Sequence, residues 1–215
     1  MKKTLLITAG CALTVLCAMP TLAAEAPGPY VSGHLGLAMP TDATVTDSTA
    51  PGLSLNVDYD TGLALDLAMG YRFGAVRMEG EIAHQKNDFD DVTVNGVGSL
   101  ASAGVPFSGD TKVTSFLING YYDFEKSSPF TPYLAAGLGF ARVKTGISLP
   151  SVDVSVSDSD TVFAYQIGAG CEYAITPMVS IDARYRYFTT SDPSFGSTDS
   201  EFSSHNLMLG ARFKF

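Results

Sequence analysis

The chain has 215 residues, 46% of them hydrophobic, and its 13 basic and 22 acidic residues give a net charge of −9. This balance excludes nucleic acid as a partner, because no basic surface is available to displace counterions from a phosphate backbone. Beyond residue 23, no stretch approaches the length of about 18 apolar residues that a transmembrane helix needs. The sequence therefore predicts no membrane-spanning helix.

The first 23 residues have the pattern of a secretory signal peptide that is cleaved on export. Lys2 and Lys3 supply the positive start, residues 4–19 are uncharged and mostly apolar, and small residues around position 23 suit cleavage. A lipoprotein signal ending at Cys11 is the alternative, but it would leave a short apolar segment. We expect the mature chain, residues 24–215, to form one domain.

Cleavage would sharpen the acidic balance and remove two of the three cysteines. The mature chain would keep 11 basic and 22 acidic residues, and Cys171 would be its single cysteine. An intramolecular disulfide is therefore excluded, and the exported protein needs another source of stability.

Apolar and polar residues alternate along most of the mature chain, as in strands with two different faces. The alternation is clearest in residues 76–82 and 179–187. Eight such strands are predicted: 30–39, 61–73, 76–86, 111–124, 131–144, 161–174, 179–188 and 202–215. Each is long enough for a tilted membrane crossing of about 9–11 residues, and their number is even.

The connections between these strands alternate in length. Residues 74–75, 125–130 and 175–178 form short connections, whereas residues 40–60, 87–110, 145–160 and 189–201 form long ones. Short periplasmic turns and long external loops produce this rhythm. We therefore expect an all-β fold, an eight-stranded antiparallel up-and-down transmembrane β-barrel with four long external loops.

A soluble up-and-down barrel has the same alternation but turns its apolar residues inward. Two features favour the membrane barrel. Both signs of charge share the polar face of neighbouring strands, and aromatic residues gather near the strand ends, as in interfacial girdles. The aromatic residues are Tyr71, Phe73, Tyr122, Phe124, Tyr173, Phe213 and Phe215 at one end, and Phe116, Phe140, Tyr165 and Tyr187 at the other.

Several segments resemble a known family. GYRF at 70–73, LINGYYD at 117–123, PYLAAGLG at 132–139 and FAYQIGAG at 163–170 are similar to segments of opacity-type surface proteins and surface antigens, small barrels like the membrane domain of OmpA-type proteins. The resemblance covers the mature chain. It implies a bacterial outer-membrane location and variable loops used in adhesion and host contact, with an external protein or host ligand.

The last seven residues, LGARFKF, resemble the terminal strand that the outer-membrane assembly machinery recognises. The resemblance therefore implies that Phe215 serves as an assembly signal.

If the apolar face contacts lipid, a charged set must face the barrel interior, here called the lumen. Its members are Asp66, Arg72, Arg77, Glu79, Glu81, Asp123, Glu172, Asp182, Arg184, Arg186 and Arg212. They could line a pore or fill the lumen as mutual ion pairs. The second interpretation is favoured, because eight strands leave room only for side chains and a buried unpaired charge is costly.

A lipid-modifying enzyme is a third possibility, since Ser203, Ser204 and His205 lie together in the last strand. Ser204 and His205 point to opposite faces. Ser203 and His205 share a face, but no acid is positioned to orient the histidine. The sequence therefore predicts no enzyme, with no catalytic, cofactor-binding or metal-binding residues.

The four long loops contain fourteen acidic residues and no Lys or Arg. This charge could simply keep the surface solvated, or it could select partners or divalent cations. The expected function is that of a structural or adhesin-like surface barrel with a closed polar lumen, acting through acidic external loops. A narrow porin-like channel is the alternative.

Four basic residues lie where strands are expected to meet the external loops. Lys86 should close one strand, Lys112 should open the next, and Arg142 and Lys144 should close the one after. Such residues could bind the phosphates of lipopolysaccharide in the outer-membrane lipid. Alternatively, they extend to water or pair with loop aspartates.

Overall fold

The computed structural model describes residues 27–41, 43–47, 54–94, 98–99, 102, 108–124, 129–149, 154–191, 194–195, 198–199 and 202–215. The predicted signal peptide and four of the loop acids, Asp42, Asp153, Asp192 and Glu201, lie outside the described residues. Within the described part, no helix is long and apolar enough to cross a membrane.

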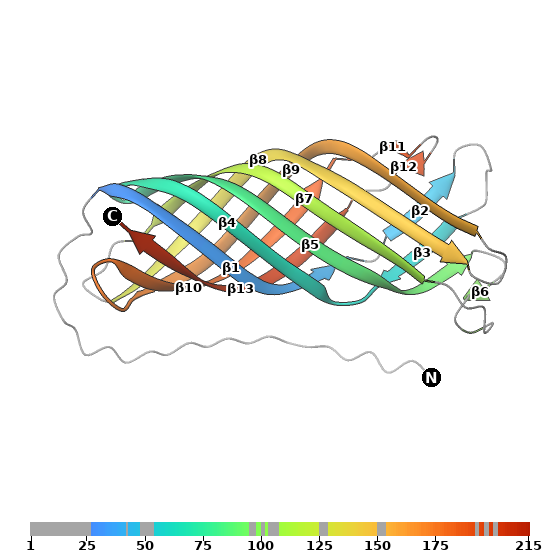
Figure 1. Ribbon diagram of the computed structural model, residues 1–215, viewed down its shortest axis with the longest axis horizontal. Coiled ribbons are helices and arrows are strands. Elements are labelled where there is room, and N and C mark those ends of the chain that lie inside the picture. Colours follow the sequence, from blue (N-terminus) through green and yellow to red (C-terminus); the bar gives the residue numbers. More distant parts are fainter. Residues whose placement is uncertain are drawn as a thin grey trace.

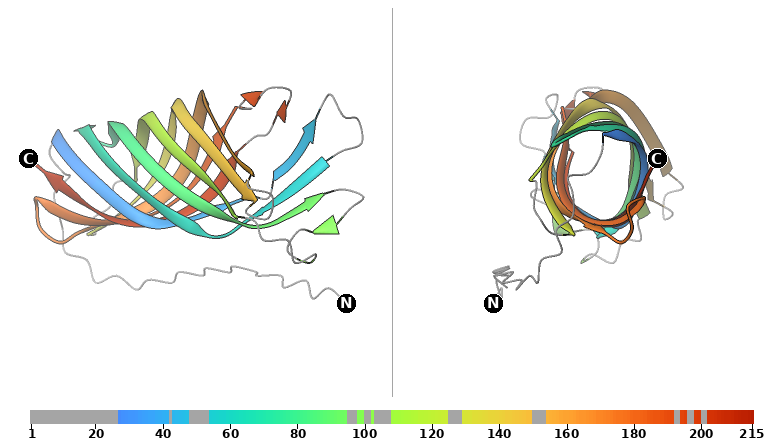
Figure 2. Two further views of the ribbon diagram at one scale, coloured as in Figure 1. Left: turned by 45° about the vertical axis from the view of Figure 1, so that its right-hand side comes forward. Right: turned by 90° about the vertical axis from the view of Figure 1, so that its left-hand side faces the viewer.

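Eight antiparallel strands form a closed ring, which confirms the predicted barrel (Figure 1). In spatial order they are β1 (Gly28–Pro40), β4 (Gly62–Phe73), β5 (Val76–Val94), β7 (Ser108–Asp123), β8 (Phe130–Leu149), β9 (Val154–Ala174), β10 (Val179–Thr190) and β13 (Ser203–Lys214). The ring closes where β1 pairs with β13, from Tyr30 opposite Lys214 to Pro40 opposite Ser204. The view along the barrel in Figure 2 shows this closure.

The alternating sequence fits this ring because successive residues point to opposite faces of a strand. In β4, Leu65 and Leu67 are exposed on the outer surface, whereas Asp66 and Ala68 are buried inside. An exposed apolar exterior around a buried charged interior is the reverse of a soluble barrel. The soluble alternative is therefore excluded.

Short turns join the strands at one end of the barrel. Gly74, in the two-residue turn between β4 and β5, has a φ of 75°, a conformation that glycine adopts without a steric penalty. At the turn between β9 and β10, the hydroxyl of Thr176 accepts a hydrogen bond from the backbone N–H of Val179 at 3.0 Å.

One side of the barrel wall is taller than the other. Strands β5, β7, β8 and β9 have 16 to 21 residues, whereas β1, β4, β10 and β13 have 12 or 13. The predicted ends at residues 86 and 144, and the start at residue 161, are therefore wrong. The β8–β9 ladder continues unbroken from Phe130 opposite Tyr173 to Leu149 opposite Val154, so backbone pairing does not stop where the apolar outer face ends.

Further strands occupy connections that the sequence predicts to be loops. They are β2 (Ala43–Asp47), β3 (Ser54–Tyr59), β6 (Gly98–Ser99), β11 (Ser194–Phe195) and β12 (Thr198–Asp199). β3 pairs with the extension of β5, β2 with β3, and β12 with β2. In Figure 1 these strands lie at the end of the barrel opposite the short turns and the C-terminus.

Candidate functional site

The lumen contains all eleven charged residues that the sequence assigns to it. Each is buried, and they come from β4, β5, β7, β9, β10 and β13. With Lys214, whose ammonium lies 2.5 Å from a Glu172 oxygen, six basic side chains face six carboxylates. The charges are thus balanced within the barrel.

The first group of ion pairs lies near the short turns. Arg77 donates two hydrogen bonds to Asp123, one from Nε and one from Nη2, both 2.8 Å long. Such a bidentate pair is among the stronger protein hydrogen bonds. Arg72 lies 3.0 Å from Asp123 and 3.4 Å from Glu172, and therefore joins β7 to β9.

Arg212 of β13 extends this group around the barrel. Its Nη1 donates to Glu172, and its Nη2 lies 3.2 Å from Asp182. Asp182 also accepts a hydrogen bond from the Tyr133 hydroxyl at 2.7 Å.

His34 connects these pairs to a second group. Its Nδ1 lies 2.7 Å from Asp66 and its Nε2 lies 3.4 Å from Asp182. Asp66 also accepts a hydrogen bond from Arg184. His34 faces inward from β1, although it does not belong to the predicted charged set.

Glu81 is the centre of the second group. Arg186 donates to it at 2.8 Å, Arg184 at 3.3 Å and the Asn119 amide at 3.0 Å. Arg186 also reaches the Gln166 carbonyl at 3.3 Å.

Tyrosines form a third part of the interior and do not belong to the predicted lumen residues. Glu79 accepts hydrogen bonds from the hydroxyls of Tyr30, at 2.9 Å, and Tyr121. The guanidinium of Arg77 lies 5.8, 4.4 and 4.9 Å from the ring centroids of Tyr30, Tyr121 and Tyr133. Their inward positions in the alternation could have revealed them.

The lumen also contains an apolar layer, which the sequence does not predict. It lies toward the external end of the barrel, the end opposite the short turns. Its members are Val113, Leu117, Ala141, Val143, Val162, Ala164, Phe188 and Phe202. Above it, the rings of Tyr59 and Phe202 have centroids 6.1 Å apart, and those of Tyr59 and Phe89 are 5.3 Å apart. The interior therefore has a charged part and an apolar part.

The four basic residues predicted near the loops lie on the outer face of β5, β7 and β8. Lys86 lies 2.7 Å from Asp88, and Lys112 lies 2.9 Å from Asp110. They do not mark strand ends as predicted, because these strands continue beyond them. Arg142 donates a hydrogen bond to the Ser159 hydroxyl at 3.2 Å.

Of the two serines considered for catalysis, only Ser203 lies on the same face as His205, and its hydroxyl is hydrogen-bonded to Tyr187 and Thr189. Ser204 is buried in the lumen, whereas His205 is exposed and its Nδ1 lies 2.7 Å from the Tyr185 hydroxyl. Among the described residues, no carboxylate is hydrogen-bonded to His205, and no group of three potential metal ligands occurs.

Eight of the loop acids have described side chains: Asp58, Asp60, Asp88, Asp90, Asp91, Asp110, Asp158 and Asp160. None is buried, so this charge lies at the surface of the external end. At the opposite end, Phe215 is 76% exposed, and its backbone N–H donates to the Pro29 carbonyl at 3.1 Å.

The chain is similar to known adhesins, opacity proteins and bacterial surface proteins. A putative adhesin of Rickettsia conorii is 33% identical over 189 residues, covering 74% of this chain and 70% of that protein. Opacity protein opA60 of Neisseria gonorrhoeae is 24% identical over 236 residues, covering 87% and 97%. The crystal structure of Neisserial surface protein A has a TM-score of 0.58 and 26% identity, covering 89% of this chain and all of that one.

Some relatives match over part of their length. The outer membrane protein PagN of Salmonella typhimurium is 33% identical over 120 residues, and the match spans 48% of this chain and 50% of PagN. A putative adhesin of Rickettsia bellii is matched over 59% of its length.

Residues 9–215 match the family described as outer membrane protein beta-barrel domain. The match, the opacity and adhesin relatives and the eight-stranded ring together confirm the predicted resemblance and outer-membrane location. The chain belongs to the family of outer-membrane β-barrel proteins, and its relatives are of the adhesin and opacity type.

Proposed function

We propose that this protein is a surface barrel, closed to solutes, that contacts external partners through its acidic outer segments. One observation in particular supports the proposal that the lumen is closed. Two ion pairs, Arg186–Glu81 at 2.8 Å and Arg72–Glu172 at 3.4 Å, join strands on opposite sides of the ring. A solute could pass only if these buried pairs separated.

Separation would be energetically unfavourable. Leaving one member of a buried ion pair without its partner costs about 3–5 kcal/mol, and these carboxylates have further partners. The tyrosines around Arg77 and the apolar layer that includes Phe188 support closure at two other depths of the lumen. The narrow channel is therefore disfavoured.

An enzymatic role is also disfavoured. His205 faces outward and is hydrogen-bonded to Tyr185, and Ser204 lies on the other side of the wall. Ser203 shares the outer face with His205, but its hydroxyl is hydrogen-bonded to Tyr187 and Thr189, and among the described residues no carboxylate is hydrogen-bonded to His205. This arrangement supports a binding function in place of a hydrolytic one.

Contact with external partners is supported by the adhesin and opacity relatives and by the position of the acidic residues. The described loop acids lie in, or next to, the ends of β3, β5, β7 and β9 that are opposite the short turns. A negatively charged surface steers the approach of positively charged partners and repels acidic ones. We therefore propose a basic protein surface as the external partner.

Adherence of bacteria that display the barrel to cultured epithelial cells tests this role. A variant with Asp58, Asp90, Asp91 and Asp158 replaced by Asn should adhere several-fold less than the wild type. A matched control carries the neutral substitutions Thr176→Ser and Met178→Leu in a short turn and should adhere normally. Equal adherence of wild type and a strain without the barrel would contradict the proposal.

A further inference from the structure

Basic residues form a row across the outer faces of the adjacent strands β5, β7 and β8. Lys86 lies opposite Lys112, and Lys112 lies opposite Lys144, so three lysines follow one another across three adjacent strands. Arg142 is two residues from Lys144 on the same face of β8. Like charges directly opposite each other destabilise a sheet unless anions accompany them.

In the described part of the chain, only two of these four basic residues, Lys86 and Lys112, form an ion pair with a carboxylate. Asp88 pairs with Lys86 and Asp110 with Lys112, at 2.7 and 2.9 Å. In the part of the chain that the structure describes, neither Arg142 nor Lys144 has a carboxylate partner, and both are exposed. The surplus positive charge is therefore concentrated on β8.

Aromatic residues lie directly beside this charge, toward the short turns. Phe116 of β7 is opposite Phe140 of β8, which is opposite Phe163 of β9. Phe140 precedes Arg142 by two residues on the outer face and is 61% exposed. This arrangement is typical of the boundary between the apolar membrane and its headgroups.

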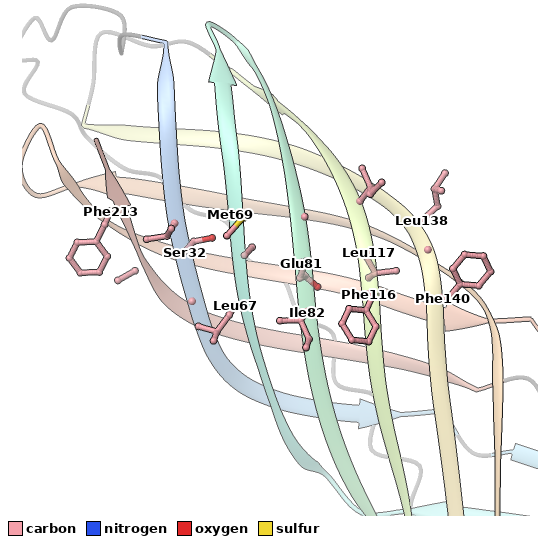
Figure 3. A pocket seen from close by; sticks show the side chains of 17 residues that line it. Ser32, Leu67, Met69, Glu81, Ile82, Phe116, Leu117, Leu138, Phe140 and Phe213 are labelled. Atoms are coloured by element: carbon pink, nitrogen blue, oxygen red, sulfur yellow. The ribbon is translucent and has the colours of Figure 1, made fainter.

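An apolar groove of about 1030 Å³ begins at these rings and runs across the outer wall (Figure 3). Phe116, Phe140 and Leu138 border it on one side, and Leu67 and Met69 of β4 lie further along. Figure 3 shows Phe140 and Leu138 projecting from the wall at one end of the groove and Phe213 at the other.

Gly80 contributes to the depth of the groove. A Cβ placed on Gly80 would meet no atom within 4 Å, so close packing does not require glycine here. Glycine also weakens a strand interior. The missing side chain leaves room in the outer wall that a lipid chain can occupy.

We propose that this wall binds one phosphorylated glycolipid of the outer leaflet, the class to which lipopolysaccharide belongs. A phosphate lies between Arg142 and Lys144, and an acyl chain lies in the groove past Phe140 to Gly80. Guanidinium and ammonium groups bind phosphate by charge-assisted hydrogen bonds, and the apolar groove excludes water from the chain.

The rest of the groove has no such charge beside it. Among the described residues, strands β1, β4, β9, β10 and β13 have no Lys or Arg whose side chain is exposed outside the barrel near the external end, because Arg184 and Arg186 point into the lumen. The basic residues therefore adjoin the groove only at the end that Phe116 and Phe140 border. This binding does not depend on whether the lumen is closed.

The test uses the full-length barrel, refolded in nanodiscs of phosphatidylcholine and titrated with bisphosphorylated lipid A. The measured quantity is the thermal unfolding midpoint as a function of lipid A content. The wild type should gain stability, and Arg142→Gln/Lys144→Gln should need about tenfold more lipid A for the same shift. Lys86→Gln, which removes an aspartate-paired lysine, should behave like the wild type.

Two glycine variants test the groove. Gly80→Val should reduce the stabilisation by lipid A, whereas Gly120→Val should not, because Gly120 also faces open space but lies outside the groove. Dephosphorylated lipid A should stabilise the wild type less than the phosphorylated form.

Three results would overturn the proposal. One is equal stabilisation by the phosphorylated and dephosphorylated lipids. Another is an equal response of the double variant and Lys86→Gln. The third is full stabilisation by inorganic phosphate alone, which would identify a soluble anion as the ligand in place of a lipid.

Discussion

Arg186 and Glu81 connect opposite walls of the barrel. The Nη1 atom of Arg186 lies 2.8 Å from a carboxylate oxygen of Glu81, although three strands separate β10 from β5 in either direction around the ring. Both side chains are buried. The lumen is thus narrow enough for two side chains to meet across it, as expected for eight strands.

Removing the carboxylate of Glu81 should destabilise the barrel. In Glu81→Leu, Arg186 and Arg184 would lose a buried partner, and the free energy of unfolding should fall by about 3–5 kcal/mol. Urea unfolding of the protein refolded in lipid vesicles measures this change. Asp88→Asn, which removes an exposed carboxylate, is the matched control and should leave the midpoint unchanged. An equal effect of the two substitutions would contradict the role of the buried pair.

The two tyrosine hydroxyls on Glu79 should act together. Tyr121→Phe and Tyr30→Phe each remove one donor, and each should cost about 1–3 kcal/mol of stability. Because both donors serve one buried carboxylate, the double variant should depart from the sum of the single effects. A double-mutant cycle by urea unfolding measures the coupling, and strict additivity would show that the hydroxyls do not cooperate.

Much of the architecture could be predicted from the sequence, because alternation and connection length carry direct physical information. Charged residues such as Asp66 and Arg184 could be assigned to the lumen, since each alternates with apolar neighbours. Their partners could not, because pairing depends on the stagger between strands. Arg72 contacts Glu172, 100 residues away in sequence.

The external part was harder to predict. The extensions of β5, β8 and β9 beyond the membrane contain Thr, Ser, Asp and Gly, whose composition suggests loops. Pairing with a neighbouring strand overrides this weak local preference. The aromatic and apolar residues inside the lumen, such as Tyr121 and Phe188, were missed because apolar character was assigned to the lipid face alone.

Gly36 should be required for closure of the barrel. A Cβ at this position would meet the backbone of β13, including the Cα of Met208 at 2.7 Å. Gly36→Val should therefore disrupt the pairing of the first and last barrel strands. Gly120→Val, which meets no backbone atom closer than 4.0 Å, is the control. Heat-modifiable migration in SDS gels reports closure, and normal folding of both variants would contradict the prediction.

Phe215 should affect assembly more than stability. Its ring is exposed and its position resembles the assembly signal of outer-membrane barrels. Deletion of Phe215 should lower the amount of protein in the outer membrane, while refolding in detergent changes little. Quantitative immunoblots of membrane fractions measure the first effect, and normal levels of the deletion variant would argue against the signal.

The conductance of the purified wild-type barrel in a planar lipid bilayer tests the closed lumen most directly. A general porin, refolded in the same way, is the positive control. Because we propose that Arg186–Glu81, Arg72–Glu172 and the apolar layer close the lumen at different depths, the barrel should insert without measurable steady current. Stable, ohmic conductance on the nanosiemens scale would contradict a closed lumen and identify the protein as a channel.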